Sequence, residues 1–446
     1  MIQTIVNAFK DKDIRKKLLF TAFIILIFRI GSVIPVPFLN IVEEIEVGKG
    51  NNILTYLSLM TGSAFTYGTI FAMSITPYIN SSIIMQLLGV AIPALEKLQK
   101  EGEEGRKKIT AITRGLTIVL GLLQSLAYFF FLRANGYLMT PATGEYNTFE
   151  QVFQAVVLIA VLTGGTAVIM WLGEQITKEG IGNGISIILF AGIVSRFPTL
   201  ITQLFRYLET GRTVYKVLVP VVCVIFLLMI AYIVLLDNAE RRVPIQYAKR
   251  VVGRKMYGGQ STHMPIKINM SGVLPIIFAS SILSLPATVQ MFLKNQPAEG
   301  TFWAKFFDAF QSDSWWYAGM YFILIIFFAY FYSTIQYNPI EMANNLRKQN
   351  GAIPGIRPGR PTSDYLMKII SRLVLIGALM ISVVALFPIV YSIICEAAIK
   401  PLGDSDGGMT ISLGGTSLII LVGVALETVR QLESQMMMRH YKGFLD

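Results

Sequence analysis

Long apolar runs separated by short polar segments fill almost the whole chain. A helix needs about 20 apolar residues to cross the hydrocarbon core of a bilayer. Ten runs approach or reach this length, near residues 18–36, 75–95, 114–132, 152–172, 183–202, 215–236, 270–290, 316–336, 369–391 and 411–429. The pattern therefore predicts an all-α membrane protein with about ten transmembrane helices and both termini on one side of the membrane.

The composition indicates that lipid is the surrounding solvent. Hydrophobic residues make up 54% of the 446 residues and charged residues only 15%, whereas about a quarter of the residues are charged in a typical soluble domain. So little polar surface cannot cover a water-facing body of this size. A net charge of +11 would suggest nucleic-acid binding in a soluble protein, but in a membrane protein the question is which loops carry it.

Lys and Arg are concentrated in alternate loops. With the N-terminus placed in the cytoplasm, cytoplasmic segments hold 28 of the 38 Lys and Arg residues and external loops hold nine. Cytoplasmic loops of membrane proteins collect positive charge. We therefore expect a multi-pass protein of the plasma (inner) membrane with both termini in the cytoplasm.

Two cytoplasmic segments, 237–269 and 337–368, are long, polar and strongly basic. The second contains Tyr337-Asn338-Pro339 and a run over 350–361 that is rich in Pro and Gly. That run forbids a continuous helix and favours tight turns. Charge that only fixes the topology is the simpler interpretation, but topology does not need this turn chemistry. We interpret the segments as ordered docking elements for a partner.

Residues 54–73 form an uncharged segment in which hydroxyl groups and glycines are frequent. An apolar span follows directly after Pro77, with no cytoplasmic loop between them. Such a segment lies at membrane depth only where protein or a water-filled cavity surrounds it. We interpret it as a short re-entrant half-helix that enters from the outside. The alternative is an amphipathic loop on the external surface.

A short internal similarity suggests two related halves. Pro77 precedes Asn80-Ser81-Ser82-Ile83, and Pro275 precedes Ala279-Ser280-Ser281-Ile282. These two stretches lie in the second helices of two five-helix halves. Because each half has an odd number of helices, the two halves have opposite orientations in the membrane. Inverted repeats usually place a pathway at their interface. We therefore expect an N-terminal half over 1–205 and a C-terminal half over 206–446.

The sequence lacks the motifs of common catalytic and nucleotide sites. No GxxxxGK[ST], HExxH or GxSxG motif occurs, so we expect no ATP hydrolysis, no enzymatic activity and no cofactor. Two cysteines and two histidines provide no metal site. The glycine-rich stretch 180–184 resembles a phosphate-binding loop, but it follows no strand and opens a span. A tight turn into the next helix is the better interpretation.

Charged groups inside the spans are nearly absent as well. Ion-coupled transporters usually carry buried carboxylates along their pathway, and no Asp or Glu lies mid-span here. An inverted-repeat secondary transporter for a small solute is therefore the second-ranked function, and an intramembrane enzyme ranks third. A passive conduit fits better, and the uncharged segment 54–73 favours one that must be kept closed.

Several stretches, in order along the chain, resemble one family of membrane proteins. They are Arg29-Ile30-Gly31 with Ile34-Pro35-Val36-Pro37, Gly173-Glu174-Gln175-Ile176-Thr177, Gly182-Asn183-Gly184-Ile185-Ser186, Gln260-Ser261-Thr262-His263-Met264-Pro265-Ile266-Lys267, Gly355-Ile356-Arg357-Pro358-Gly359 and Gly414-Gly415-Thr416-Ser417. Their order and spacing, from about residue 14 to 440, resemble the SecY/Sec61-alpha family of protein-conducting channels. The resemblance implies two five-helix halves around an hourglass pore, closed by a re-entrant plug.

The resemblance also implies roles for particular residues in the pore. The pore ring of aliphatic side chains would be Ile75, Ile79, Ile185, Leu189, Ile277 and Ile420. The plug, roughly 57–71, would include Leu57, Met60, Phe65 and Phe71. Aliphatic groups give a passing polypeptide no specific hold, and a narrow apolar constriction can seal by dewetting. Without the resemblance, an apolar pair spaced i,i+4 is more often core or lipid contact.

The remaining implied roles concern the lateral gate and the partners. The gate residues would be Asn80, Gln124, Ser281 and Leu285. A motor or ribosome would dock on Arg357, with weaker candidates at Arg241, Arg242, Lys249 and Arg250. The implied partners are SecE, SecG in many relatives, the SecA ATPase, the ribosome, polypeptides that carry signal sequences, and the lipid bilayer.

Overall fold

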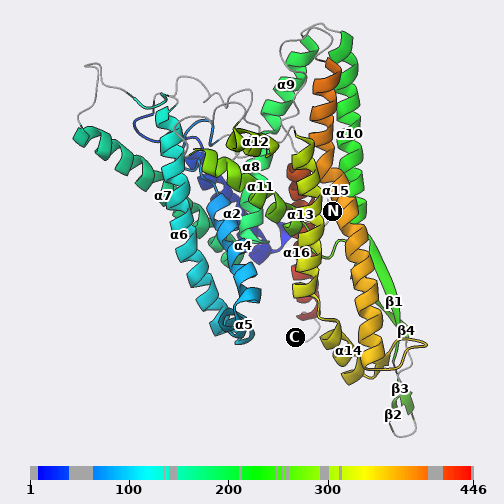
Figure 1. The fold of residues 1–446 in the computed structure, drawn as a ribbon. Coiled ribbons are helices and arrows are strands. Elements are labelled where there is room, and N and C mark those ends of the chain that lie inside the picture. The colour runs from blue at the N-terminus through cyan, green and yellow to red at the C-terminus, as the bar shows by residue number, and fades with distance from the viewer. Residues whose placement is uncertain are drawn as a thin grey trace.

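The computed structural model describes residues 9–39, 64–134, 136–139, 148–209, 213–247, 250–252, 255–257, 261–291, 301–310, 314–399 and 415–442. Within these ranges the chain forms a bundle of long helices with a small β-sheet at one end (Figure 1). The helices at the ten predicted spans are α2 (Lys12–Gly31), α4 (Thr76–Ala91), α6 (Glu103–Ala134), α7 (Thr148–Glu179), α8 (Gly184–Val194) with α9 (Phe197–Glu209), α10 (Thr213–Asn238), α11 (Leu274–Met291), α13 (Trp315–Gln336), α15 (Arg360–Ile399) and α16 (Gly415–Lys442).

Seven helices of the described part are long and apolar enough to cross a membrane, and the bent pair α4 and α5 (Pro93–Lys100) would make eight. The two other predicted spans coincide with α2 and α11. Helix α2 carries four cations near its start and Arg29 near its end, and the apolar stretch of α11 is short, Leu274–Pro286. Each predicted span therefore contains a helix, and the all-α membrane fold is confirmed.

Several helices extend beyond the predicted spans. Helix α15 has 40 residues, which is about 60 Å at 1.5 Å per residue and roughly twice the thickness of the hydrocarbon core. Between α4 and α5 the chain bends by 106°, because Pro93 begins α5 and cannot donate a hydrogen bond back into α4. Gly102, with a φ of 80°, then turns the chain into α6.

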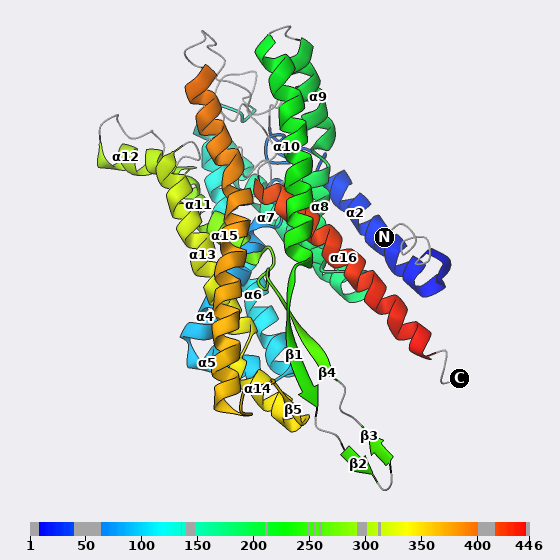
Figure 2. The ribbon, with the colours of Figure 1, turned by 90° about the vertical axis from the view of Figure 1, so that its right-hand side faces the viewer.

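The segments that were predicted to be cytoplasmic lie on one face of the bundle. Ile14 near the start of α2, Ile181 between α7 and α8, and Leu432 in α16 form one apolar cluster. Arg430 of α16 forms an ion pair of 3.0 Å with Asp237 at the end of α10. Figure 2 shows the sheet extending from this end of the bundle. Both described ends of the chain therefore lie on the same face, as the even number of spans predicts.

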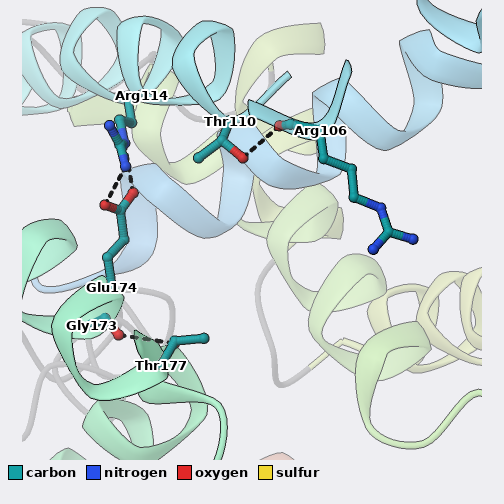
Figure 3. Close-up of polar contacts among 6 residues, drawn as sticks. All are labelled: Arg106, Thr110, Arg114, Gly173, Glu174 and Thr177. Carbon is teal, nitrogen blue, oxygen red and sulfur yellow. Dashed lines mark hydrogen bonds and ion pairs between the residues drawn. The ribbon is translucent and has the colours of Figure 1, made fainter. Parts of the chain in front are cut away.

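The connection from α7 to α8 is a tight turn, as predicted, and its side chains explain the motif found there. Thr177 donates a hydrogen bond to the carbonyl of Gly173 (Figure 3) and accepts one from the amide of Gly184. Asn183 caps α8 by accepting from the amide of Ile185 at 3.1 Å. A Cβ atom at Gly184 would collide with the Gly173 carbonyl, so only glycine allows this close approach.

The two basic loops fold together into one unit, which was not predicted. Strand β1 (Glu240–Tyr247) pairs antiparallel with β4 (Ser261–Lys267) on one side and with β5 (Gly351–Ala352) on the other. A further hairpin, β2 (Arg250–Val252) with β3 (Lys255–Tyr257), continues the first. Val243 and Ile245 of β1 face inward and pack on side chains of α15 and of α14 (Pro339–Lys348). The sequence predicted ordered segments with tight turns but not this sheet, because β1 shows only two inward-facing apolar positions.

An ion pair joins α6 to α7 on the same face. Arg114 Nε donates to Glu174 Oε1 at 2.7 Å, and a second guanidinium nitrogen binds the other carboxylate oxygen (Figure 3). The Glu174 side chain is 15% exposed and that of Arg114 is 42% exposed. A bidentate pair with one partner largely buried is stronger than an exposed surface pair.

We expect Glu174→Gln to lower the stability of the folded bundle by about 1–3 kcal/mol, because it removes a charged hydrogen-bond acceptor from a partly buried guanidinium. The measurement is the thermal unfolding midpoint of the purified protein in detergent. Glu103→Gln is the matched control, because its pair with Lys107 is almost fully exposed and should contribute little. Equal midpoints for the two variants would contradict this expectation.

Candidate functional site

The six residues predicted to line a pore lie in one apolar core. They come from the first two turns of α4, α8, α11 and α16, with Ile75 as the N-cap residue of α4. Four of them, Ile75, Ile79, Leu189 and Ile420, are buried members of the largest apolar cluster, and Ile185 and Ile277 pack against it from partly buried positions. The resemblance therefore selected side chains from four separate helices that the fold gathers into the same core.

A buried non-helical segment lies beside this core. Residues 64–75, here called the turn segment, form consecutive turns that lead into α4. Ala64, Thr69 and Ala72 have no exposed surface. The alternative of a loop on the external surface is therefore wrong for this part. The expected half-helix is not found between 64 and 73 either, because Gly68 and Ser74 have positive φ angles of 55° and 47° that break helical geometry. Leu57 and Met60 lie outside the described residues.

The turn segment is held by α2 and α6. Tyr128 of α6 donates a hydrogen bond of 2.7 Å to the carbonyl of Phe65, and the two rings are 4.6 Å apart. Phe71 stacks on Phe28 of α2 at 6.0 Å. The amide of Val36, in the chain that follows α2, donates to the carbonyl of Gly68 at 2.9 Å. These contacts satisfy part of the backbone of a segment that has no helix of its own.

Two glycines make room for the turn segment. A Cβ atom at Gly165 of α7 would collide with the carbonyl of Ile70, and one at Gly31 of α2 would collide with the ring of Phe71. Gly164, the neighbour of Gly165, has open space around it. The segment therefore fits against the backbones of α2 and α7 only because both positions lack a side chain.

The predicted gate helices meet along a seam. Helix α4 packs against α6, and α11 packs against α13, while α11 touches both α6 and α4. Asn80 is buried on α4, Gln124 and Ser281 are partly buried on α6 and α11, and the structure describes no hydrogen bond that joins these three side chains. Leu285 is exposed on α11 and lines a surface groove. The four residues thus occupy the expected helices, but no single contact unites them.

The predicted docking residues lie on the unit formed by the two basic loops. Arg241, Arg242 and Arg357 are exposed, and Arg250 belongs to β2. Arg242 is paired with Glu240 at 2.8 Å, which reduces the charge it offers to a partner. Thr362 donates a hydrogen bond to the carbonyl of Arg357 and fixes its turn. Lys249 lies outside the described residues.

The basic unit is ordered by its own caps and turns. Asn338 caps α14 by accepting from the amides of Ile340 and Glu341, and Pro339 occupies the first helical position that tolerates it. Gly355 and Gly359 have φ angles of 80° and 109°, a region that favours glycine. The predicted tight turns in this loop are therefore confirmed.

The sequence and the fold both match known proteins. Residues 69–429 match the SecY family. Proteins described as protein translocase subunit SecY are 41% identical in Streptomyces scabiei and 39% identical in Mycobacterium bovis, with 100% of both chains covered. The chain belongs to the SecY family. It is a subunit that forms a protein-conducting translocation channel, and it is not an enzyme.

Solved SecY-type structures share the fold. One described as a protein conducting channel matches with a TM-score of 0.63 at 18% identity, covering 94% of this chain and 92% of that one. Sec61 in a canine ribosome-channel complex matches with a TM-score of 0.59 at 16% identity, with the same coverage. The family assignment decides against the small-solute transporter, the second-ranked interpretation of the sequence.

Sequence reasoning missed the residues that hold the turn segment. Tyr128, Gly165 and Phe28 were not singled out, because each lies in an apolar run whose pattern is fully explained by a transmembrane helix. The signal that could have found Tyr128 and Gly165 is local. A hydroxyl group or a Gly-Gly pair within a span indicates a helix contact more clearly than a further apolar side chain does. Contacts between membrane helices favour small residues, and they favour polar groups that find a partner there.

We expect Gly165→Ala to displace the turn segment, because the new methyl group meets a backbone carbonyl that can move only with the segment. Overpacking of this kind costs about 1–3 kcal/mol. The channel should leak ions at rest, measured as conductance of the purified protein in a planar bilayer. Gly164→Ala is the control, since it makes the same change of helix propensity one residue away in open space. Equal resting conductance in both variants would refute this expectation.

Proposed function

We propose that the chain moves unfolded secretory polypeptides through a pore lined by Ile75, Ile79, Ile185, Leu189, Ile277 and Ile420 across the plasma membrane. The single observation that carries this proposal is the gathering of these side chains, from four helices, in one apolar core beside the buried turn segment. Aliphatic side chains neither pair with charges nor accept hydrogen bonds, so they hold no passing sequence. A ring of them seals by dewetting when no chain is present.

The turn segment is the proposed plug. Its contacts are a few aromatic stacks and single hydrogen bonds, and small residues such as Ala64 and Ala72 fill the rest of its buried surface. A segment held in this way is easier to displace than a transmembrane helix, which has its full set of internal hydrogen bonds. One related structure is described as showing that the SecY plug domain stabilises the closed state and maintains a membrane seal.

We propose that the seam between α11 and the pair α4 and α6 opens sideways to release the helices of membrane proteins into lipid. The structure describes no hydrogen bond between Asn80, Gln124 and Ser281 at the seam, so apolar packing would supply much of what holds it shut. An apolar signal sequence can replace such packing at little cost. Under this proposal the chain consists of two inverted halves, whose predicted boundary at 205/206 falls within α9.

The face that carries the β-sheet is the proposed cytoplasmic face, and both termini would lie there. Its exposed Arg241 and Arg357 are suited to polyanionic ribosomal RNA and to the acidic surface of a motor protein. Related channels are described in complexes with ribosomes. We extend this to the chain's own partners, which would be SecE, SecG, the SecA ATPase and the ribosome.

A secretory polypeptide stalled in the channel should crosslink to probes placed at Ile79 and Ile277, because both would face the pore. The measurement is photo-crosslinking in membrane vesicles, scored by the yield of the joined product. A probe at Leu228 of α10, whose side chain is 63% exposed, is the control and should give no crosslink. Crosslinks found only at the control position would rule out this pore.

Arg357→Glu should strongly reduce motor-driven export while the protein stays folded and inserted, because it reverses the charge of an exposed docking residue. The measurement is the rate of ATP-dependent import of a secretory precursor into inverted membrane vesicles. Arg360→Glu makes the same change of charge three residues away and is the control. If both variants import at the wild-type rate, docking through Arg357 is wrong.

A further inference from the structure

A groove lined only by apolar side chains lies between α11, α12 (Phe302–Ala309) and α13. Its volume is about 630 Å³, within the range of small-molecule sites. It is lined by Ile282, Leu283, Leu285, Pro286, Val289, Trp303, Phe306, Phe307, Phe310, Met320, Ile323 and Leu324. Figure 2 shows α12 extending sideways from the bundle at the end where α11 and α13 meet, away from the β-sheet.

The groove has a buried floor and a rim that faces outward. Leu283 and Phe307 on the floor are 1% and 5% exposed. Leu285, Val289, Trp303 and Ile323 on the rim are all more than half exposed. In a bundle that crosses a membrane, apolar side chains exposed along the spans face lipid. The groove is therefore continuous with the lipid-facing surface of α11 and α13.

Tryptophans mark the depth of the groove in the membrane. Trp303 on α12 and Trp315 and Trp316 at the start of α13 are all exposed, and tryptophan side chains are enriched where hydrocarbon meets head groups. Ile323 and Leu324 lie eight and nine residues after Trp315, which places them roughly 12–14 Å deeper along the helix. The groove thus reaches from the interface into the hydrocarbon region.

We propose that this groove binds one acyl chain of a membrane phospholipid. Water is a poor occupant, because the lining offers it no hydrogen-bond partners. The adjoining sequence 294–300 is mostly polar and is equally unsuited. Lipid chains are the apolar molecules present at this depth, and the rim opens toward them. Lys305 and Asp308 give α12 no net charge, so the site recognises the acyl chain of the lipid and not its head group.

The test uses the full-length chain with Trp171→Phe, Trp315→Phe and Trp316→Phe, which leaves Trp303 on the rim as the only tryptophan. The protein is purified in detergent and titrated with phosphatidylcholine brominated in the middle of its acyl chain, a quencher of tryptophan fluorescence. Quenching should saturate at a single lipid per protein and should be reversed by unbrominated lipid. Brominated phosphatidylglycerol should give the same half-saturation within about twofold, a difference of under 0.5 kcal/mol.

A variant that narrows the rim separates this site from ordinary lipid contact. Leu285→Phe with Ile323→Phe should weaken half-saturation at least about tenfold, or 1.4 kcal/mol. Leu227→Phe with Leu228→Phe, at exposed positions of α10, is the matched control and should change nothing. Native mass spectrometry of the chain with all its tryptophans, with and without the rim substitutions, gives a second count of retained lipid.

Three results would overturn the proposal. Quenching that rises without saturation and is equal in all variants would show surface lipid only. Saturable quenching that the rim substitutions leave unchanged would place the lipid elsewhere. Reversal of the quenching by a hydrophobic signal peptide but not by unbrominated lipid would make the groove a peptide site.

Discussion

The structure depends on one constraint of the bilayer, which is that backbone polar groups away from water must find partners within the protein. Helices meet it internally, and the turn segment at residues 64–75 cannot. Several of its carbonyls and amides are satisfied by its own turns, by the chain after α2 and by the Tyr128 hydroxyl. Gly31 and Gly165 allow the helices to enclose it closely. The bundle is therefore built around a segment that could not exist in lipid alone.

The elements that could be predicted are those with a sequence pattern that extends over many residues. Ten apolar runs gave ten helical regions, and the alternation of charge placed the connecting segments on one face, where Ile14, Ile181 and Leu432 join them. The turn at Gly182-Asn183-Gly184 was also predictable, since glycine and asparagine have specific conformational reasons to occur there. The β-sheet was not, because β1 shows only two inward-facing apolar positions, Val243 and Ile245, and its partner β5 lies more than a hundred residues later.

The candidate pore shows a different limit. The apolar i,i+4 pairs on α4 and α8 are visible in the sequence, but nothing in a single chain tells a pore-facing pair from a lipid-facing one. Family resemblance supplied that choice, and the fold placed all six residues in one core. Leu285 shows the same limit. The resemblance assigned it to the gate, and it lies at an exposed position of α11, one turn beyond Ser281.

Helix α15 runs from the basic unit far into the helical bundle. Its first turns pack on α14 and the sheet, and along its length of roughly 60 Å it touches α13, α10 and α16. Pro388 removes one backbone hydrogen bond near the far end of α15, and α13 is the most extensive helix neighbour of α15. The basic unit and the helices of the bundle therefore share one continuous backbone, so a partner bound to that unit would contact the same helix that packs within the bundle.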